Sequence, residues 1–233
     1  MFIISIIQLT LIALWTLIFV YVLTLLLPSK ISLWLTVHLW APVCELIVLS
    51  PMKVDGLEKL DKNKNYVFMA NHSSFYDIPC LFWGSKRMLH FLCKAELKKS
   101  IFTGFMLRKL QMIFIDRGNA QKTAASMRQA VELISQGMNI AIFPEGTRTK
   151  TGALGTFKKG GFKLAINSQT DIVPVTIKNS AIAWSRSNLK FRPTKVYIHF
   201  GEPISVVGLH ENDAADLAST VFTIINEELA KKN

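Results

Sequence analysis

The sequence is poor in cysteine, and its first residues carry no charge. Residues 1–29 contain no Asp, Glu, Lys or Arg, which is unusual for the start of a soluble domain. The three cysteines, Cys44, Cys80 and Cys93, are odd in number and form no Cys-x-x-Cys pair. These features exclude a disulfide framework and a cysteine-based zinc site. The sequence also shows no internal repeat, linker or low-complexity segment, so we expect no repeat array.

Acidic residues are scarce, with 16 Asp and Glu against 27 Lys and Arg, and the net charge is +11. Residues 1–50 hold only Lys30 and Glu45, so the whole excess belongs to residues 51–233. A basic domain beside an apolar segment favours anionic lipid headgroups as partners, because each nearby Lys or Arg gains about 1 kcal/mol. We expect no nucleic-acid partner, since no binding motif is recognisable. An acidic carrier protein would be attracted to the same surface.

The N-terminal segment is the most apolar part of the sequence. Residues 2–27 form an unbroken apolar run, longer than the ~20 residues that a helix needs to cross a bilayer. No basic stretch precedes the run and no small-residue cleavage site follows it, which disfavours a removable signal peptide. A turn is predicted at residues 28–30, before a second apolar stretch, Ile31–Ser50, which Pro42 is expected to interrupt.

Residues 1–50 are therefore expected to form a membrane anchor of one or two apolar helices. The second stretch either completes a spanning hairpin or lies in the interface, and both arrangements remain open. The basic residues that follow favour a cytoplasmic location for residues 51–233.

Residues 51–233 alternate short apolar runs with longer amphipathic ones, which is typical of an α/β domain. Runs rich in β-branched and aromatic residues predict six strands. These are Tyr66–Ala70, Met88–Leu92, Met112–Asp116, Ile140–Phe143, Ile172–Ile177 and Val196–Phe200. Helices are predicted over residues 119–136, between an Asn119 cap and Gly137, and over residues 213–230. We expect an α/β fold with a single mixed-sheet domain flanked by helices, preceded by an apolar two-helix anchor.

One segment combines a histidine and an aspartate at the end of a predicted strand. It reads Asn-His-Ser-Ser-Phe-Tyr-Asp over residues 71–77, and strand ends are where α/β sites usually lie. With His72 in a turn and Asp77 in the first turn of a helix, the carboxylate can bond one ring nitrogen. That bond fixes the tautomer and leaves the other nitrogen as a base. The alternative is a helix-capping aspartate beside a buried histidine. A metal site is disfavoured, because no further ligand stands at suitable spacing.

The same segment resembles the NHX₄D signature of the glycerolipid acyltransferase family. Further blocks resemble those of the family and occur in the same order over about residues 65–205. They are Lys94–Leu97 with Phe114–Arg117, Phe143–Arg148, Ile172–Val175 and the late element Gly201–Ile204. The sequence departs from the pattern at Ile101, where the family usually has Pro, near Gln111, where it has Gly, and at Thr149, where it has Ser. These departures concern backbone shape or a conservative hydroxyl, so they bear on the acceptor more than on the chemistry.

The resemblance is greatest to bacterial members that acylate 1-acyl-sn-glycerol 3-phosphate, or lysophosphatidic acid. It implies transfer of a fatty acyl group from acyl carrier protein or coenzyme A to the 2-hydroxyl, which gives phosphatidic acid for phospholipid biosynthesis. It implies that His72 and Asp77 are catalytic and that no cofactor or metal is needed beyond the thioester cosubstrate. Residues 51–233 would then be an acyltransferase domain on the cytoplasmic side of the inner membrane.

Six residues in the matching blocks are candidates for binding the substrate: Lys94, Arg117, Glu145, Gly146, Thr147 and Arg148. Arg117 and Arg148 follow predicted strands, and a guanidinium offers the planar fork that suits a phosphate monoester. Glu145 is expected to orient an arginine or a glycerol hydroxyl, or to form a structural salt bridge. Gly146 allows close backbone approach.

Two other functions stay open at this point. The first is acyl transfer to a different lysophospholipid or to a lyso-amino-lipid, which would depend less on Arg117 and Arg148. The second is a non-catalytic lipid-binding membrane protein, which the intact pair of His72 and Asp77 disfavours. Assays of acyl transfer to several lysolipid acceptors would discriminate between them.

Overall fold

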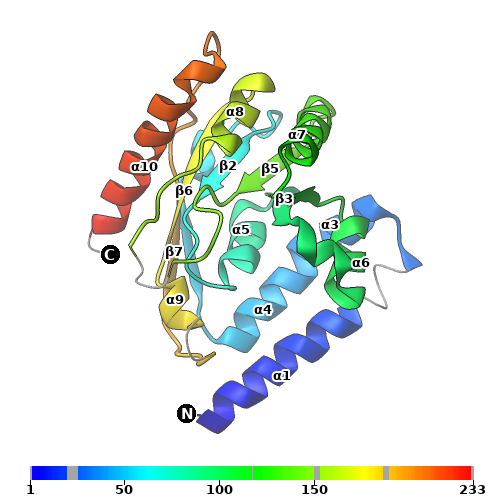
Figure 1. Ribbon diagram of the computed structural model, residues 1–233. Coiled ribbons are helices and arrows are strands. Elements are labelled where there is room, and N and C mark those ends of the chain that lie inside the picture. Colours follow the sequence, from blue (N-terminus) through cyan, green and yellow to red (C-terminus); the bar gives the residue numbers. More distant parts are fainter. Residues whose placement is uncertain (1, 20–25, 117, 150–152, 186–188, 232–233) are drawn as a thin grey trace.

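The computed structural model of the protein describes residues 2–19, 26–116, 118–149, 153–185 and 189–231 (Figure 1). Within them, one seven-stranded sheet has the order β1-β7-β6-β2-β5-β3-β4. The strands are β1 (Met52–Asp55), β2 (Val67–Ala70), β3 (Leu89–Lys94), β4 (Ile113–Ile115), β5 (Asn139–Ile142), β6 (Ile172–Lys178) and β7 (Val196–Phe200). The strands from β6 to β4 run parallel, whereas β7 is antiparallel to β6. The predicted mixed sheet is thus confirmed.

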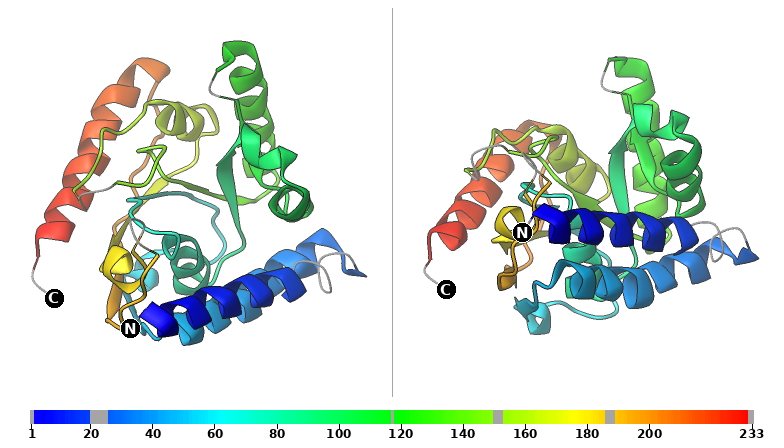
Figure 2. Two further views of the ribbon diagram at one scale, coloured as in Figure 1. Left: turned by 60° about the horizontal axis from the view of Figure 1, so that its bottom comes forward. Right: turned by 90° about the horizontal axis from the view of Figure 1, so that it is seen from below.

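Helices cover both faces of this sheet (Figures 1 and 2). The longer ones are α1 (Phe2–Ile18), α3 (Ser29–Leu35), α4 (Ala41–Val48), α5 (Asp77–Ser85), α6 (Ile101–Lys109), α7 (Ala120–Ser135), α8 (Gly160–Asn167) and α10 (Ala214–Ala230). Shorter ones are η2 (Thr36–Trp40), η3 (Leu57–Lys59), η4 (Ala95–Lys99), α9 (Ser180–Ala183) and η5 (Glu211–Asp213). Helices α7, α8 and α10 lie on one face, and α5 lies on the other with α4 and α1 beyond it. The predicted flanking by helices is confirmed.

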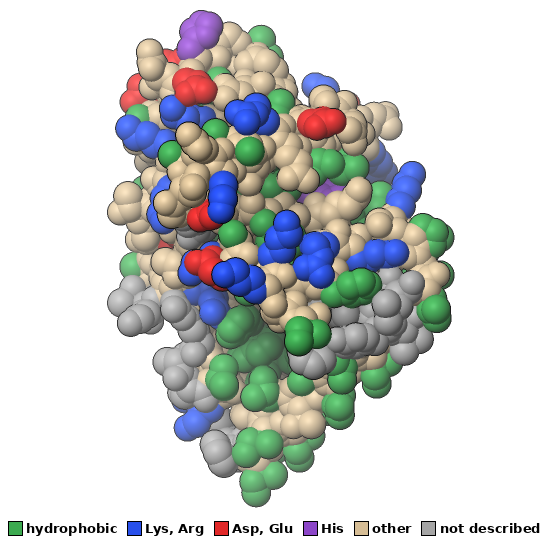
Figure 3. Space-filling model, turned by 45° about the vertical axis from the view of Figure 1, so that its right-hand side comes forward, with side chains coloured by type: hydrophobic (Ala, Val, Ile, Leu, Met, Phe, Trp, Pro, Cys, Tyr) green, Lys and Arg blue, Asp and Glu red, His purple; other side chains and the backbone are tan. Residues whose placement is uncertain are grey.

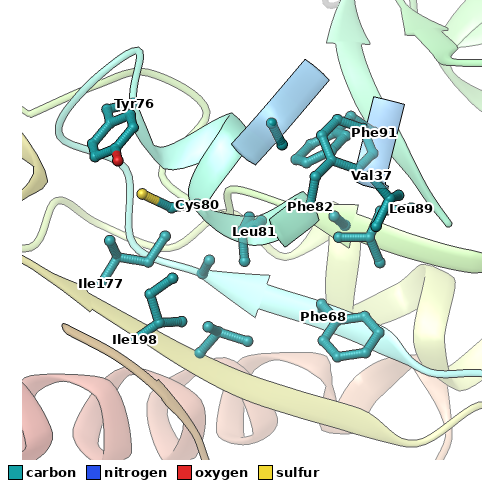
Figure 4. Packing of buried hydrophobic residues seen from close by; sticks show 14 of the residues in the cluster. Val37, Phe68, Tyr76, Cys80, Leu81, Phe82, Leu89, Phe91, Ile177 and Ile198 are labelled. Carbon is teal, nitrogen blue, oxygen red and sulfur yellow. The ribbon is translucent and has the colours of Figure 1, made fainter. Parts of the chain in front are cut away.

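Alternation along the strands divides the core into two clusters. Val67 and Met69 of β2 point to the face under α7, α8 and α10, whereas Phe68 and Ala70 point to the α5 face. Figure 4 shows Leu81 of α5 directed toward the sheet on that second face. Because both faces are covered, β6 is buried along its whole length, which explains why five of its seven residues are apolar.

The sequence predicts six strands and misses β1. This strand pairs with β7 at the edge of the sheet, in register from Met52 with Val196 to Asp55 with His199. Its residues alternate between half-buried and exposed, and two of its four side chains, Lys53 and Asp55, are charged. A short edge strand with a charged outer face has little of the composition on which strand prediction depends.

The two N-terminal apolar stretches form helices whose lengths differ from the expectation. Helix α1 ends at Ile18, and residues 20–25 lie outside the described residues. The second stretch is helical without a break from Ser29 to Val48, so the expected interruption at Pro42 is wrong. A π-helical turn, η2, stands directly before α4 and changes the hydrogen-bond partners there, which accommodates the missing N–H of the proline.

By length and composition, the helix from Ser29 to Val48 is the one in the described residues that could cross a membrane, and it suggests membrane association. Helix α1 is apolar but shorter, and it packs against α4 (Figure 2). Ile12 of α1 and Val37 and Val48 of the second helix belong to the same hydrophobic cluster as the sheet. The N-terminal helices therefore share a core with the rest of the chain.

The outer side of α1 is exposed and apolar. Its large aliphatic side chains are between 42% and 72% exposed. They are Ile3, Ile4, Ile6, Ile7, Leu11, Leu14, Leu17 and Ile18. Figure 3 shows hydrophobic side chains gathered over the lower part of the molecule, with Lys and Arg side chains in a band above them. An exposed apolar area of this extent is typical of a surface that contacts a membrane or another protein.

Candidate active site

The site lies where two neighbouring parallel strands end. His72 follows β2 and Glu145 follows β5, so the pairing of these strands brings together segments that are 73 residues apart. Asn71 holds the chain as it leaves β2. Its side-chain amide donates to the carbonyl of Ile177 at 2.9 Å and accepts from the N–H of Ile177 at 2.7 Å. The start of the turn is thereby fixed to β6.

His72 and Asp77 are in contact. Nδ1 of His72 lies 2.7 Å from Oδ2 of Asp77, whose side chain is fully buried. The same oxygen accepts the backbone N–H groups of Ser73 at 2.7 Å and Ser74 at 2.8 Å. Because an ionised carboxylate can only accept hydrogen bonds, Nδ1 of the ring is the donor. The turn before α5 thus wraps around the carboxylate at the start of that helix.

The ring of His72 is also held on its face. It stacks on the ring of Phe143, with centroids 3.9 Å apart and an angle of 12° between the planes. The side chain of His72 is 15% exposed. Contact with Asp77 at one edge and Phe143 at one face leaves the ring with little freedom to rotate.

Glu145 binds the backbone of the histidine turn. Its Oε1 accepts the N–H of His72 at 2.7 Å and its Oε2 accepts the N–H of Gly155 at 2.8 Å. The residue is 4% exposed, and burial raises the pKa of its carboxyl group, although the two N–H donors oppose that shift. The N–H of Thr149 also donates to the carbonyl of His72 at 2.9 Å. Glu145 was expected to face an arginine or a glycerol hydroxyl, whereas its oxygens face backbone amides.

A cavity of about 460 Å³ opens beside the ring of His72. This volume lies in the range typical of small-molecule sites. Gly146, Thr147, Arg148 and Lys94 border the cavity together with His72. Most of the remaining lining is apolar and comes from β3, α5, α6 and the N-terminal helices. It includes Ile12, Phe19, Trp40, Ile78, Phe82, Phe91, Met106, Leu110 and Phe143.

The predicted cationic residues occupy different surroundings. Cζ of Arg148 lies 3.5 Å from the ring centroid of Phe75, a cation–π contact that holds the guanidinium at the cavity wall. Nζ of Lys94 lies 2.9 Å from Oε1 of Glu96 on the exposed surface. Arg117 lies outside the described residues. The described residues also contain no group of three His, Cys, Asp or Glu side chains that could hold a metal ion.

Comparison with known proteins agrees with this geometry. The sequence model of the family described as Acyltransferase matches residues 51–178, which is more than half of the chain. The chain belongs to the acyltransferase family. The matched region contains both members of the dyad of His72 and Asp77.

Two curated members of this family are similar to the chain over most of its length. A 1-acyl-sn-glycerol-3-phosphate acyltransferase of Borreliella burgdorferi is 31% identical over 179 residues, which is 77% of this chain and 70% of the relative. One of Saccharomyces cerevisiae is 30% identical over 205 residues, which is 85% of this chain and 66% of the relative. The crystal structure of the acyltransferase PlsC of Thermotoga maritima superposes with a TM-score of 0.82 at 21% identity. It covers 100% of this chain and 97% of that one, and shows the same fold.

Several residues of this acyltransferase site were not assigned a role from the sequence. Asn71 and Phe143 lie inside the matching blocks, but their contacts with Ile177 and with the ring of His72 depend on strand pairing. Gly155 lies outside the blocks, and its backbone N–H carries no signal in a sequence. The cavity-lining residues of the N-terminal helices, such as Ile12, precede the matched region 51–178.

Proposed function

We propose that the chain transfers an acyl group from a thioester to the free hydroxyl of 1-acyl-sn-glycerol 3-phosphate, giving phosphatidic acid. The observation that carries this proposal is the dyad of His72 and Asp77 at the wall of an apolar cavity that Arg148 also borders. The names of the curated relatives support the same acceptor. A thioester of acyl carrier protein or of coenzyme A is the donor, and no other cofactor is required.

In this reaction His72 is the general base. With its Nδ1–H donated to Asp77, Nε2 is the nitrogen that takes the proton of the acceptor hydroxyl. The hydroxyl oxygen attacks the thioester carbonyl carbon, and the carbon–sulfur bond then breaks. The departing thiolate takes the proton from Nε2, so the ring ends as it began. Asp77 stabilises the imidazolium that exists between these steps, as the carboxylate of a serine-protease triad does.

The acceptor phosphate is assigned to the polar wall of the cavity. Arg148 offers a planar fork for two phosphate oxygens, and its stacking on Phe75 orients that fork before the substrate arrives. Gly146 and Thr147 border the same wall. Lys94 and Arg117 are proposed as further cations for the phosphate, from their places in the matching blocks. Glu145 is proposed as a positioning residue, because both of its oxygens bind backbone N–H groups.

The apolar part of the cavity is proposed to hold the acyl chain. Its wall includes Ile12 of α1, the helix whose outer side is exposed and apolar, and Phe19, which follows that helix. We propose that the protein lies at the cytoplasmic face of the inner membrane, with residues 1–50 as its anchor. A lipid acceptor and a soluble thioester would then meet at the membrane surface.

The test of this function uses the purified chain with both thioester donors and a mixture of lysolipid acceptors, followed by mass analysis of the products. We expect phosphatidic acid as the main product. His72→Ala should remain folded and lose activity by about 10²–10⁴. Turnover close to that of the unsubstituted chain would refute the role of His72.

The acceptor is tested separately with Arg148→Lys. A lysine keeps the charge but lacks the planar fork, so the KM for lysophosphatidic acid should rise about tenfold. The KM for lysophosphatidylethanolamine, which has no phosphate monoester, should change less. Equal changes for both acceptors would contradict the assignment of the phosphate to Arg148.

A further inference from the structure

A second cavity lies at the opposite end of the central strands from the dyad. It has a volume of about 780 Å³ and is bordered by the residues that lead into β2, β3 and β5, such as Lys62 and Met88. Leu33, Trp34 and His38 of the second N-terminal helix border it on another side. The two cavities have no lining residue in common, so this one is separate from the proposed active site.

The charged lining of this second cavity is cationic. Lys30, Lys62, Lys86 and Arg87 border it, and none of its described lining residues is acidic. The carboxylate of Asp61 interacts with Arg87 but does not line the cavity. Within the described part of the chain, the ammonium groups of the three lysines form no ion pair with a carboxylate. Four cations around a concave site, three of them without an ion pair among the described residues, create a positive potential that attracts an anion.

Two of these cations are held in place by the fold. The guanidinium of Arg87 donates to two backbone carbonyl oxygens at 2.7 and 2.8 Å and lies 5.3 Å from the ring centroid of Tyr66. Lys86 ends α5 in the left-handed conformation, with φ of 54°, at a position where glycine is the usual residue. Its Nζ lies 5.8 Å from the ring centroid of Trp83. Cations that are already ordered lose less freedom when a ligand binds.

An exposed aromatic pair stands beside the cations. Trp34 is 51% exposed, and its ring lies 4.6 Å from that of His38, one helical turn away. Both belong to the helix that is long and apolar enough to cross a membrane. Exposed tryptophan on such a helix is typical of the headgroup region of a bilayer. Basic pockets beside membrane helices are known to bind acidic headgroups.

We propose that this cavity is a second anion site, which binds the phosphate of an acidic phospholipid headgroup. The ligand chemistry is a phosphate monoester or diester, and free phosphate would meet the same cations. Trp34 and the apolar helix that carries it favour the lipid as the source. The site is independent of the acyl-transfer function proposed above, since it shares no residue with that cavity.

The experiment compares two pairs of substitutions that remove equal charge. Lys62→Gln with Lys86→Gln changes the second cavity, and Lys53→Gln with Lys195→Gln changes exposed lysines at the β1–β7 edge. The purified full-length chain in neutral detergent is titrated with dihexanoyl phosphatidic acid, dihexanoyl phosphatidylcholine and inorganic phosphate. Native mass spectrometry counts the bound molecules and gives the Kd of each. Arg148→Ala is added to every variant, so that binding at the proposed acceptor site is removed.

We expect phosphatidic acid to bind the cavity variant about thirtyfold more weakly than the control, which is about fivefold for each lysine. Phosphatidylcholine should bind weakly to both. The same two pairs are also compared without Arg148→Ala, where the count of bound phosphatidic acid should fall from two to one only in the cavity variant. This second comparison covers the case in which Arg148→Ala disturbs folding.

Each other outcome overturns part or all of the proposal. Equal affinity of the two lysine pairs for phosphatidic acid refutes the site, as does equal affinity of phosphatidic acid and phosphatidylcholine. Inorganic phosphate that binds as tightly as phosphatidic acid, with the same loss in the cavity variant, refutes the lipid as the source. None of these results depends on acyl transfer, so failure of the proposed function would not produce them.

Discussion

Glu145→Gln separates a positioning role from a substrate-binding role. Both carboxylate oxygens of Glu145 accept a backbone N–H, from His72 at 2.7 Å and from Gly155 at 2.8 Å. Glutamine has the same shape but only one accepting oxygen. Its amide nitrogen must therefore face one of the two N–H groups, and one of the two bonds is lost whichever way the amide turns.

The size of the effect follows from that lost bond. Leaving one buried N–H without an acceptor costs about 1–3 kcal/mol. If the amide turns its nitrogen toward His72, the whole cost falls on the turn that carries the catalytic ring. Converted at 1.4 kcal/mol for each factor of ten, the expected decrease in kcat is about fivefold to a hundredfold. The KM for the lysolipid should change little, because Glu145 touches backbone rather than substrate.

The assay is steady-state kinetics with lysophosphatidic acid as the varied substrate. Glu132→Gln on the exposed side of α7 removes the same charge without touching the site, and it serves as the control. A rise in KM at unchanged kcat would show that Glu145 binds the acceptor, because loss of uniform binding has that signature. That result would refute the positioning role.

Three further predictions follow from the same geometry. Asp77→Asn should keep the fold. Its amide oxygen can stay at the position of Oδ2, and its nitrogen can take the position of Oδ1, an oxygen that accepts no hydrogen bond from the described residues. The kcat should still fall by about 10²–10⁴, because the charge that stabilises the imidazolium is gone. Stability should depend on pH through Glu145: its raised pKa favours the folded state below the ordinary carboxyl pKa, and this contribution is lost as pH rises through the raised value. Thermal unfolding over that range should show the unsubstituted chain losing stability relative to Glu145→Gln. Asn71→Ala should lower the free energy of unfolding by about 1–3 kcal/mol, measured by chemical denaturation, because it leaves both backbone groups of Ile177 without their partner.

Local features of the fold and of the site could be predicted from the sequence because they depend on neighbours along the chain. Asn119 caps α7 by accepting the N–H of Lys122 at 2.9 Å, and Gly137 follows that helix with φ of 84°. The contact between His72 and Asp77 is local in the same sense, since it needs only a turn that leads into a helix. Spacing and residue type are enough to specify such features.

Contacts between distant segments could not be predicted in this way. The N–H of His72 meets Glu145 because β5 pairs with β2, although β3 and β4 come between them in the chain. Nothing in the composition of β5 indicates which strand it pairs with. The order of a parallel sheet is determined by how the helices pack on its faces, which is a property of the whole chain. The role expected for Glu145 depended only on its place in the block Phe143–Arg148. In the structure its oxygens bind the backbone N–H groups of His72 and Gly155 instead.

The sequence divides the chain into an anchor, residues 1–50, and a separate domain, but in the structure the N-terminal helices pack against that domain. Val37, Ala41 and Cys44 are at most 1% exposed, and this side of the second helix packs against α5 through both η2 and α4. Burying apolar surface contributes roughly 25 cal/mol per Å², so this cover stabilises α5 together with the sheet beneath it. Ile12 lines the same cavity as His72, so the N-terminal helices also form part of the wall against which the acyl chain is proposed to lie. The N-terminal helices therefore belong to the same packed unit as the site, and a change in how they pack would change the shape of the cavity.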